Sequence, residues 1–154
     1  MDWDAIGAVG EILGAAAVVV TLALLIRQLR QNTESLKIQS LNNVFGEWVA
    51  MTGELQTQPE LRKAFFNDAS GGALESDERL LLRVYFVRIL HANDKVYHLY
   101  QQGAADRFTF ESIQKTLFDI VGESHFFPDW WSFNKWRYST AFRELIDKEL
   151  GNKS

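Results

Sequence analysis

The stretch Ile6–Ile26, IGAVGEILGAAAVVVTLALLI, decides the fold of this chain. It carries one ionisable group, Glu11, in 21 residues. As a helix with a rise of about 1.5 Å per residue it would be about 31 Å long, which matches the hydrocarbon core of a bilayer. The sequence therefore predicts a transmembrane helix at 6–26, preceded by a short extracytoplasmic segment at 1–5.

Residues on both sides of this stretch are suited to the membrane interfaces. Trp3 precedes it at headgroup depth, and Arg27, Arg30 and Lys37 follow it. Because no basic residue stands before the stretch, the positive-inside bias places the N-terminus outside and the rest of the chain in the cytoplasm. We expect a single-pass protein of the bacterial inner membrane whose first partner is the lipid bilayer.

The apolar stretch has two other interpretations besides a transmembrane helix. A cleaved signal peptide needs a basic leader, but Asp2 and Asp4 stand there and Glu11 interrupts the apolar region, so Ala15–Ala17 resemble a processing site only superficially. A buried helix of a soluble protein stays open, because the stretch is rich in Ala and only moderately hydrophobic.

Small and polar residues share one face of the predicted span. At 100° per residue, a stripe about 100° wide contains Gly7, Gly10, Glu11, Gly14, Val18, Thr21 and Leu25. A Gly-x-x-x-Gly pair permits close backbone approach, and a carboxyl group on the same face avoids lipid by meeting another helix. The stripe predicts a homo-oligomer with an interface at Gly7, Gly10, Glu11, Gly14 and Thr21. The stripe is also compatible with an ion pore lined by Glu11. A third interpretation is that Gly and Ala are simply frequent in membrane helices.

The remaining sequence has helical periodicity and almost no strand signals. Residues 27–58 predict a juxtamembrane stalk helix that Gly46 and Gly53 could interrupt, and Pro59 suits the start of a short helix through Phe66. Further predictions are a loop at 68–72, a long helix capped by Ser76 and ending at Gly103, a helix at 109–121 and one or two helices at 129–150. The fold class is all-α: a cytoplasmic helical domain at 59–151, packed as an antiparallel bundle, then a tail at 152–154.

Composition excludes several classes of protein. The net charge is −4 with no basic block, which argues against nucleic-acid binding, and the absence of Cys excludes disulfide scaffolds, zinc ribbons and thiol nucleophiles. The chain also lacks a phosphate-binding Gly loop, a G-x-S-x-G elbow and an H-E-x-x-H motif. We expect no cofactor, no catalytic residues and no enzymatic activity.

Two other groups of residues could bind something. His91, Asp94 and His98 can share one helix face, but the two histidines stand about 10 Å apart along the axis, so they are weak metal ligands and are best explained as structural residues. Aromatic residues are dense between Phe126 and Phe142. They predict either a core that uses Trp for packing or a surface that covers a partner's groove or the bilayer.

Both ends of the chain resemble a family of small uncharacterised bacterial membrane proteins. The start WDAIGAVGEILGAAAVVVTLALLIRQLRQNTESLK matches its W-x-A-I-G-x-x-G-E-type span and Q-x-R-Q-N-T-like continuation, and the tail FFPDWWSFNKWRYSTAFRELIDKEL is similar to its ending. The positions that carry the resemblance are Trp3, Gly7, Gly10, Glu11, Gly14, Gln31, Asn32 and Thr33. The resemblance implies the same architecture and no chemistry.

Three functions follow as hypotheses. The first is an oligomerising, membrane-anchored scaffold or an accessory subunit that contacts other subunits of a membrane complex. The second is a small homo-oligomeric channel with a pore lined by Glu11. The third and weakest is a metal- or ligand-binding sensor built on His91, Asp94 and His98.

Overall fold

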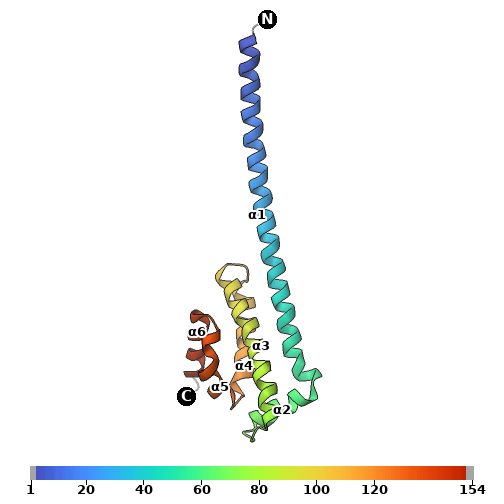
Figure 1. The fold of residues 1–154 in the computed structure, drawn as a ribbon, viewed down its shortest axis with the longest axis vertical. Coiled ribbons are helices and arrows are strands. Elements are labelled where there is room, and N and C mark those ends of the chain that lie inside the picture. Colours follow the sequence, from blue (N-terminus) through green and yellow to red (C-terminus); the bar gives the residue numbers. More distant parts are fainter. Residues whose placement is uncertain (1–2, 152–154) are drawn as a thin grey trace. The chain divides into compact units, whose positions relative to one another are not determined.

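The computed structural model describes residues 3–151 of the chain, with side chains from Gly7 onward except those of Ala8 and Val9. The side chain of the expected anchor Trp3 and the tail at 152–154 therefore lie outside what is described. The described residues form helices joined by short turns and loops, without strands, as expected for an all-α protein (Figure 1). They form two compact units, Met1–Gln39 and Ser40–Ser154.

Helix α1 runs from Trp3 to Thr57 and contributes to both units. It continues through Gly46 and Gly53, where the sequence allowed a bend. Its part in the second unit buries Val44 and Trp48, which are 7% and 5% exposed. The second unit therefore begins at Ser40, whereas the sequence placed the start of the helical domain at Pro59.

The second unit contains five further α-helices and one 3₁₀ turn within the described residues. They are α2 (Pro59–Ala69), α3 (Ser76–Gln101), α4 (Arg107–Gly122), α5 (Phe127–Asn134), η1 (Lys135–Arg137) and α6 (Thr140–Gly151). Pro59 opens α2 as predicted, because proline has no N–H to lose at the first helical position. The region expected as one or two helices at 129–150 is interrupted by η1 and by extended backbone at Tyr138.

Helix α3 lies at the centre of the core of the second unit. Leu82, Phe86, Ile89, Leu90 and Val96 are all fully buried on it. The Phe86 ring packs edge-on against Phe127 of α5 at a centroid distance of 5.1 Å, and Tyr97 lies 6.3 Å from Phe142 of α6. One helix thus joins the core to both C-terminal helices, which agrees with the apolar residues around much of its circumference.

The start of α3 differs from the prediction. Its N-cap is Glu75 and not Ser76, and Glu78 closes a capping box by accepting the Glu75 N–H at 3.0 Å. Asn67, near the end of α2, donates to the same Glu78 carboxylate at 3.1 Å and fixes it there. These bonds hold the pKa of Glu78 below its usual value, the backbone bond from Glu75 contributing most.

The turn between α2 and α3 depends on glycine. Gly71 has a φ of +74°, which is the left-handed region, and a Cβ at Gly72 would collide with the side chain of Asn67. Helix α2 also continues to Ala69, beyond the predicted end at Phe66, so Asp68 belongs to a helix and not to the expected loop.

Candidate functional site

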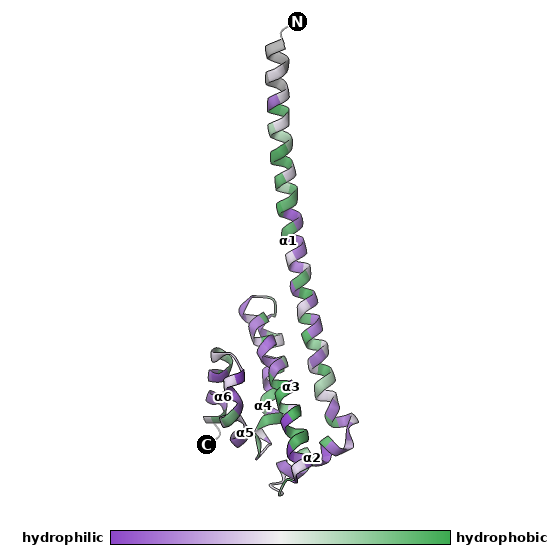
Figure 2. Cartoon of the chain, in the orientation of Figure 1, coloured by the Kyte–Doolittle hydropathy of each residue, from purple (hydrophilic) through white to green (hydrophobic). Residues whose placement is uncertain are grey.

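The apolar part of α1 has no cover from the chain itself. The helix contains an 18-residue window with a mean hydropathy of 2.2, and none of that window is buried, so by length and composition it is suited to crossing a membrane. Figure 2 shows this hydrophobic run in the N-terminal half of α1. Large side chains such as Leu13, Val19 and Ile26 are 53–65% exposed there. Such a surface requires an apolar environment.

The predicted interface residues are free of packing contacts within the described chain. A Cβ added at Gly7, Gly10 or Gly14 would meet nothing within 4 Å. Glu11 is exposed, and no described residue bonds to it. Thr21 donates its hydroxyl to the Ala17 carbonyl at 2.8 Å, so its polar group is satisfied inside its own helix. The stripe is therefore open to another molecule.

The three basic residues after the apolar stretch are not equivalent. Lys37 pairs with Glu34 at 3.3 Å, which is an ordinary i, i+3 helix pair. Arg27 and Arg30 are in none of the salt bridges formed by the described residues. Their guanidinium groups therefore have no carboxylate partner among the described residues.

The geometry around His91, Asp94 and His98 explains the three residues without a metal. Asp94 accepts from the Ser139 N–H at 3.2 Å and from its hydroxyl at 2.7 Å, so it holds the residue before α6. His91 lies against the Tyr138 ring at 4.8 Å, and His98 Nε2 is 3.6 Å from Asp94 Oδ1. No group of three or more His, Asp or Glu side chains in the described part of the chain could hold a metal ion.

The aromatic C-terminal segment divides into core and surface. Phe127, Trp130, Trp131, Tyr138 and Phe142 are at most 5% exposed, as expected for packing in a small core. Phe133 and Trp136 are 79% and 71% exposed. The segment therefore contributes five rings to the core, whereas contact of the exposed Phe133 and Trp136 with a partner or the bilayer stays a prediction.

Trp131 is also fixed by a polar contact. Its indole N–H donates to Asp147 Oδ1 at 2.7 Å, and Lys135 donates to the other carboxylate oxygen at 2.8 Å. Partial burial by itself raises the pKa of Asp147, but these two hydrogen bonds together with the positive charges of Lys135 and Arg143 hold the pKa below its usual value. The contact joins α5 and η1 to α6.

Asp68 is a buried polar centre that no sequence pattern predicted. It is 2% exposed, accepts the hydroxyl of Ser124, and accepts the Phe126 N–H at 2.9 Å. The Ser124 hydroxyl in turn accepts the Phe127 N–H at 2.9 Å. The last turn of α2 thus satisfies N–H groups at the start of α5 and fixes where that helix begins.

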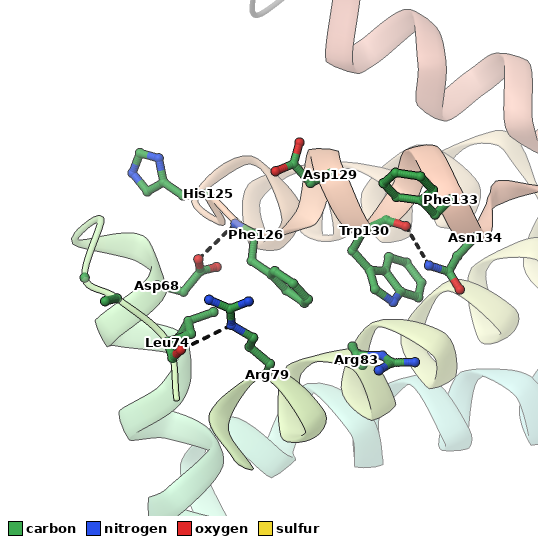
Figure 3. Close-up of a pocket in the computed structure, with 12 residues that line it drawn as sticks. Asp68, Leu74, Arg79, Arg83, His125, Phe126, Asp129, Trp130, Phe133 and Asn134 are labelled. Atoms are coloured by element: carbon green, nitrogen blue, oxygen red, sulfur yellow. Dashed lines mark hydrogen bonds between the residues drawn. The ribbon is translucent and has the colours of Figure 1, made fainter. Parts of the chain in front are cut away.

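An open groove lies between α3 and α5, and we call it the α3–α5 groove. It consists of two adjoining hollows of about 570 and 220 Å³ that share Arg83, Trp130 and Asn134. In Figure 3 the rings of Phe126 and Trp130 point from α5 toward α3, where Arg79 and Arg83 stand. Arg137 lines the smaller hollow.

The arginines of the groove are held to different degrees. Arg79 donates Nε to the Leu74 carbonyl at 3.2 Å, and Arg88 pairs with Glu54 at 2.7 Å. Arg83 and Arg137 form no salt bridge with any described residue, although the Arg137 guanidinium lies 5.4 Å from the Trp136 ring centroid. Of the two aspartates that line the groove, Asp68 is fully hydrogen-bonded and Asp129 points away from α3 in Figure 3.

Sequence reasoning missed this groove because its members come from separate elements. Arg79 and Arg83 stand at i and i+4 on α3, a local signal that two cations share a face. Nothing in that spacing places Trp130 or Arg137 opposite them.

Comparison with family models, with curated proteins and with solved structures finds no match to this chain. The family resemblance of the two chain ends therefore stays a prediction, and the functional proposals below rest on the structure and the sequence alone.

Proposed function

We propose that the chain is a non-enzymatic, single-pass protein of the bacterial inner membrane that self-associates and acts as a scaffold or accessory subunit of a membrane assembly. Residues 6–26 span the bilayer with the N-terminus outside. The unit from Ser40 onward is a helical domain in the cytoplasm, packed as an antiparallel bundle, whose surface is available to other subunits.

The observation that carries this proposal is the uncovered apolar window of α1. Exposed apolar surface costs roughly 25 cal/mol per Å² in water, and a run of this length cannot be stable there without cover. Arg27 and Arg30, which have no carboxylate partner in the described chain, are suited to the headgroups on the cytoplasmic side.

Self-association is supported by the stripe that contains Glu11. A carboxyl group facing lipid is costly, and a second helix that accepts or donates a hydrogen bond removes most of that cost. The open space above Gly7, Gly10 and Gly14 allows a helix to approach closely at this place. These glycines have no role in packing the described part of their own chain, so an interface gives them one.

The mass of the full chain in nanodiscs tests the proposal. We expect the wild type to give a multiple of the 17.7 kDa chain mass, and Gly10→Leu and Glu11→Leu to give fewer copies. Ala16→Leu is the matched control, since it adds the same bulk on the opposite side of the helix and should leave the mass unchanged. A wild type that is always one copy, or a mass that none of the three variants alters, would refute self-association.

A second candidate is a cation channel, and the exposed, unpaired carboxyl group of Glu11 is what favours it. Several copies closed around the stripe would form a carboxylate ring, which attracts cations in a pore. This alternative predicts cation-selective conductance in planar bilayers that Glu11→Gln reduces and Ala16→Leu does not. Bilayers that stay silent over a range of voltage and pH would exclude it.

A further inference from the structure

The α3–α5 groove has unsatisfied positive charge on a surface that the proposed function does not use. Arg83 and Arg137 line it without a carboxylate partner among the described residues, and Arg79 uses only its Nε. An arginine guanidinium presents five donors in a planar fork that matches phosphate and carboxylate oxygens. The groove therefore suits an anionic ligand.

Large apolar side chains protrude beside these arginines. Leu80 and Val84 of α3 line the smaller hollow and are 56% and 50% exposed, and Phe133 of α5 lines the larger one at 79%. Trp136 is 71% exposed in η1, next to Arg137. Arginine beside exposed Trp, Phe and Leu is the composition of surfaces that enter the headgroup region of a bilayer.

We propose that the α3–α5 groove and its protruding rim, formed by Leu80, Val84, Phe133 and Trp136, bind the anionic phospholipid headgroups of a membrane. This inference rests on the proposed function, since the membrane anchor of α1 tethers the second unit to a bilayer. The anchor supplies a high effective concentration of lipid, so a contact that is weak in solution becomes populated.

A bilayer surface fits this face better than an acidic protein helix does. A helix lying in the groove would cover Trp130 and meet Arg83, but Trp136 lines neither hollow and would stay in water. A membrane surface meets the arginines with its phosphates and receives the protruding rings between its headgroups at the same time. It thus satisfies both the charge and the exposed apolar groups.

The chain has no cysteine, so a single fluorescent label can be placed without background. An environment-sensitive label at Ser132→Cys reports on α5 at the position next to Phe133 of the rim, and the same label at Ser112→Cys reports on α4 as the matched control. Both serines are exposed and helical. The full chain is reconstituted into vesicles of phosphatidylcholine alone or with one quarter phosphatidylglycerol. A headgroup-attached nitroxide lipid serves as the quencher.

We expect quenching at Ser132→Cys in the anionic vesicles only, and none at Ser112→Cys in either. Removing both free charges with Arg83→Gln and Arg137→Gln should weaken docking about 25-fold, taking about fivefold per arginine. The paired control Arg62→Gln with Lys115→Gln removes two exposed cations outside the groove and should preserve the quenching. Circular dichroism of each variant checks that the helices are retained.

Two results would overturn the inference. One is a label at Ser132→Cys that stays in water in anionic vesicles. If an added acidic amphipathic helical peptide then shifts the emission of this label, the groove is assigned to a protein partner instead. The other is quenching that the Arg83 and Arg137 substitutions do not reduce. Anchoring is measured separately, as retention of the chain in the vesicle pellet at pH 11, so failure of the anchor and failure of groove docking give different results.

Discussion

The two units of the chain use the same secondary structure with opposite surfaces. In the described residues of Met1–Gln39, the apolar side chains of α1 point outward with nothing of the chain against them, whereas Ser40–Ser154 encloses Phe86, Leu117, Phe127 and Ile146 completely. Helix formation is therefore common to both, and what differs is the medium that each surface requires. The second unit covers its apolar side chains with its own core, and we propose that lipid or other copies of the chain cover those of the first.

The largest expected effect breaks the second unit and leaves the first intact. Phe86→Ala removes a fully buried ring that contacts Phe127 and Trp130, so we expect a loss of about 3–5 kcal/mol in the free energy of unfolding. Denaturant unfolding followed by Trp fluorescence measures it, and membrane retention should not change. The control Phe133→Ala, at a ring that is 79% exposed, should stay within about 0.5 kcal/mol of wild type. Equal losses in both variants would contradict the core described above.

The next effect concerns the polar centre that fixes the start of α5. Asp68→Ala leaves the Ser124 hydroxyl and the Phe126 N–H buried without an acceptor, which should cost about 2–3 kcal/mol. Asp68→Asn keeps acceptor capacity and should cost less. Thermal unfolding of both variants, with the exposed Asp129→Ala as control, measures the difference. Asp68→Ala with the stability of wild type would show that α5 is positioned by apolar packing alone.

These contacts show what local sequence could and could not predict. The Pro59 start and the long apolar periodicity of α3 were predictable because each depends on neighbours in sequence. The cap at Glu75 was not, because Ser76 is the better N-cap by residue type, and the bond from Asn67 of α2 that supports Glu78 is a contact between two helices. Asp68 of α2 accepts a hydrogen bond from Ser124, which follows the end of α4. No pattern within one helix contains this pairing.

The Glu11 stripe and the α3–α5 groove likewise differ in whether local sequence could predict them. The stripe around Glu11 is a property of one helix and could be found by its periodicity. The α3–α5 groove requires Arg83 and Arg137 to lie near each other from different elements, and only tertiary packing brings them there. In the same way, the aromatic density of the C-terminal segment was visible, but which rings are buried depended on the side that α5 turns inward.

A smaller difference between the two units is expected in how each responds to pH. The backbone and hydroxyl of Thr109 hold the pKa of Asp106 below its usual value, and the pKa of Asp147 is also lowered. A carboxyl group with a lowered folded-state pKa stabilises the fold above its unfolded pKa of about 4, and that stability is lost as the pH falls through the folded value. We therefore expect the second unit to lose stability below about pH 4, while membrane retention of the first unit does not follow it.

Asp147→Asn tests this pH dependence. We expect about 1 kcal/mol lower stability than wild type at pH 7, because the charge-assisted bond from Lys135 is lost, and a gap that narrows toward pH 2. Thermal unfolding at pH 7, 4 and 2 measures it, with Asp119→Asn at an exposed position of α4 as the control. A gap that stays constant with pH would show that the effect comes from packing around Trp131 and not from the carboxylate charge.

The most direct test of the central claim, that the uncovered part of α1 lies in a bilayer, is the rate at which a water-soluble maleimide labels single cysteines. In the otherwise cysteine-free chain, Val20→Cys stands in the apolar stretch and Ser35→Cys stands beyond Arg27 and Arg30. For the full chain in nanodiscs, we expect fast labelling of Ser35→Cys and labelling of Val20→Cys only after the nanodisc is dissolved and the chain unfolded. Equal labelling rates at the two positions in intact nanodiscs would contradict it.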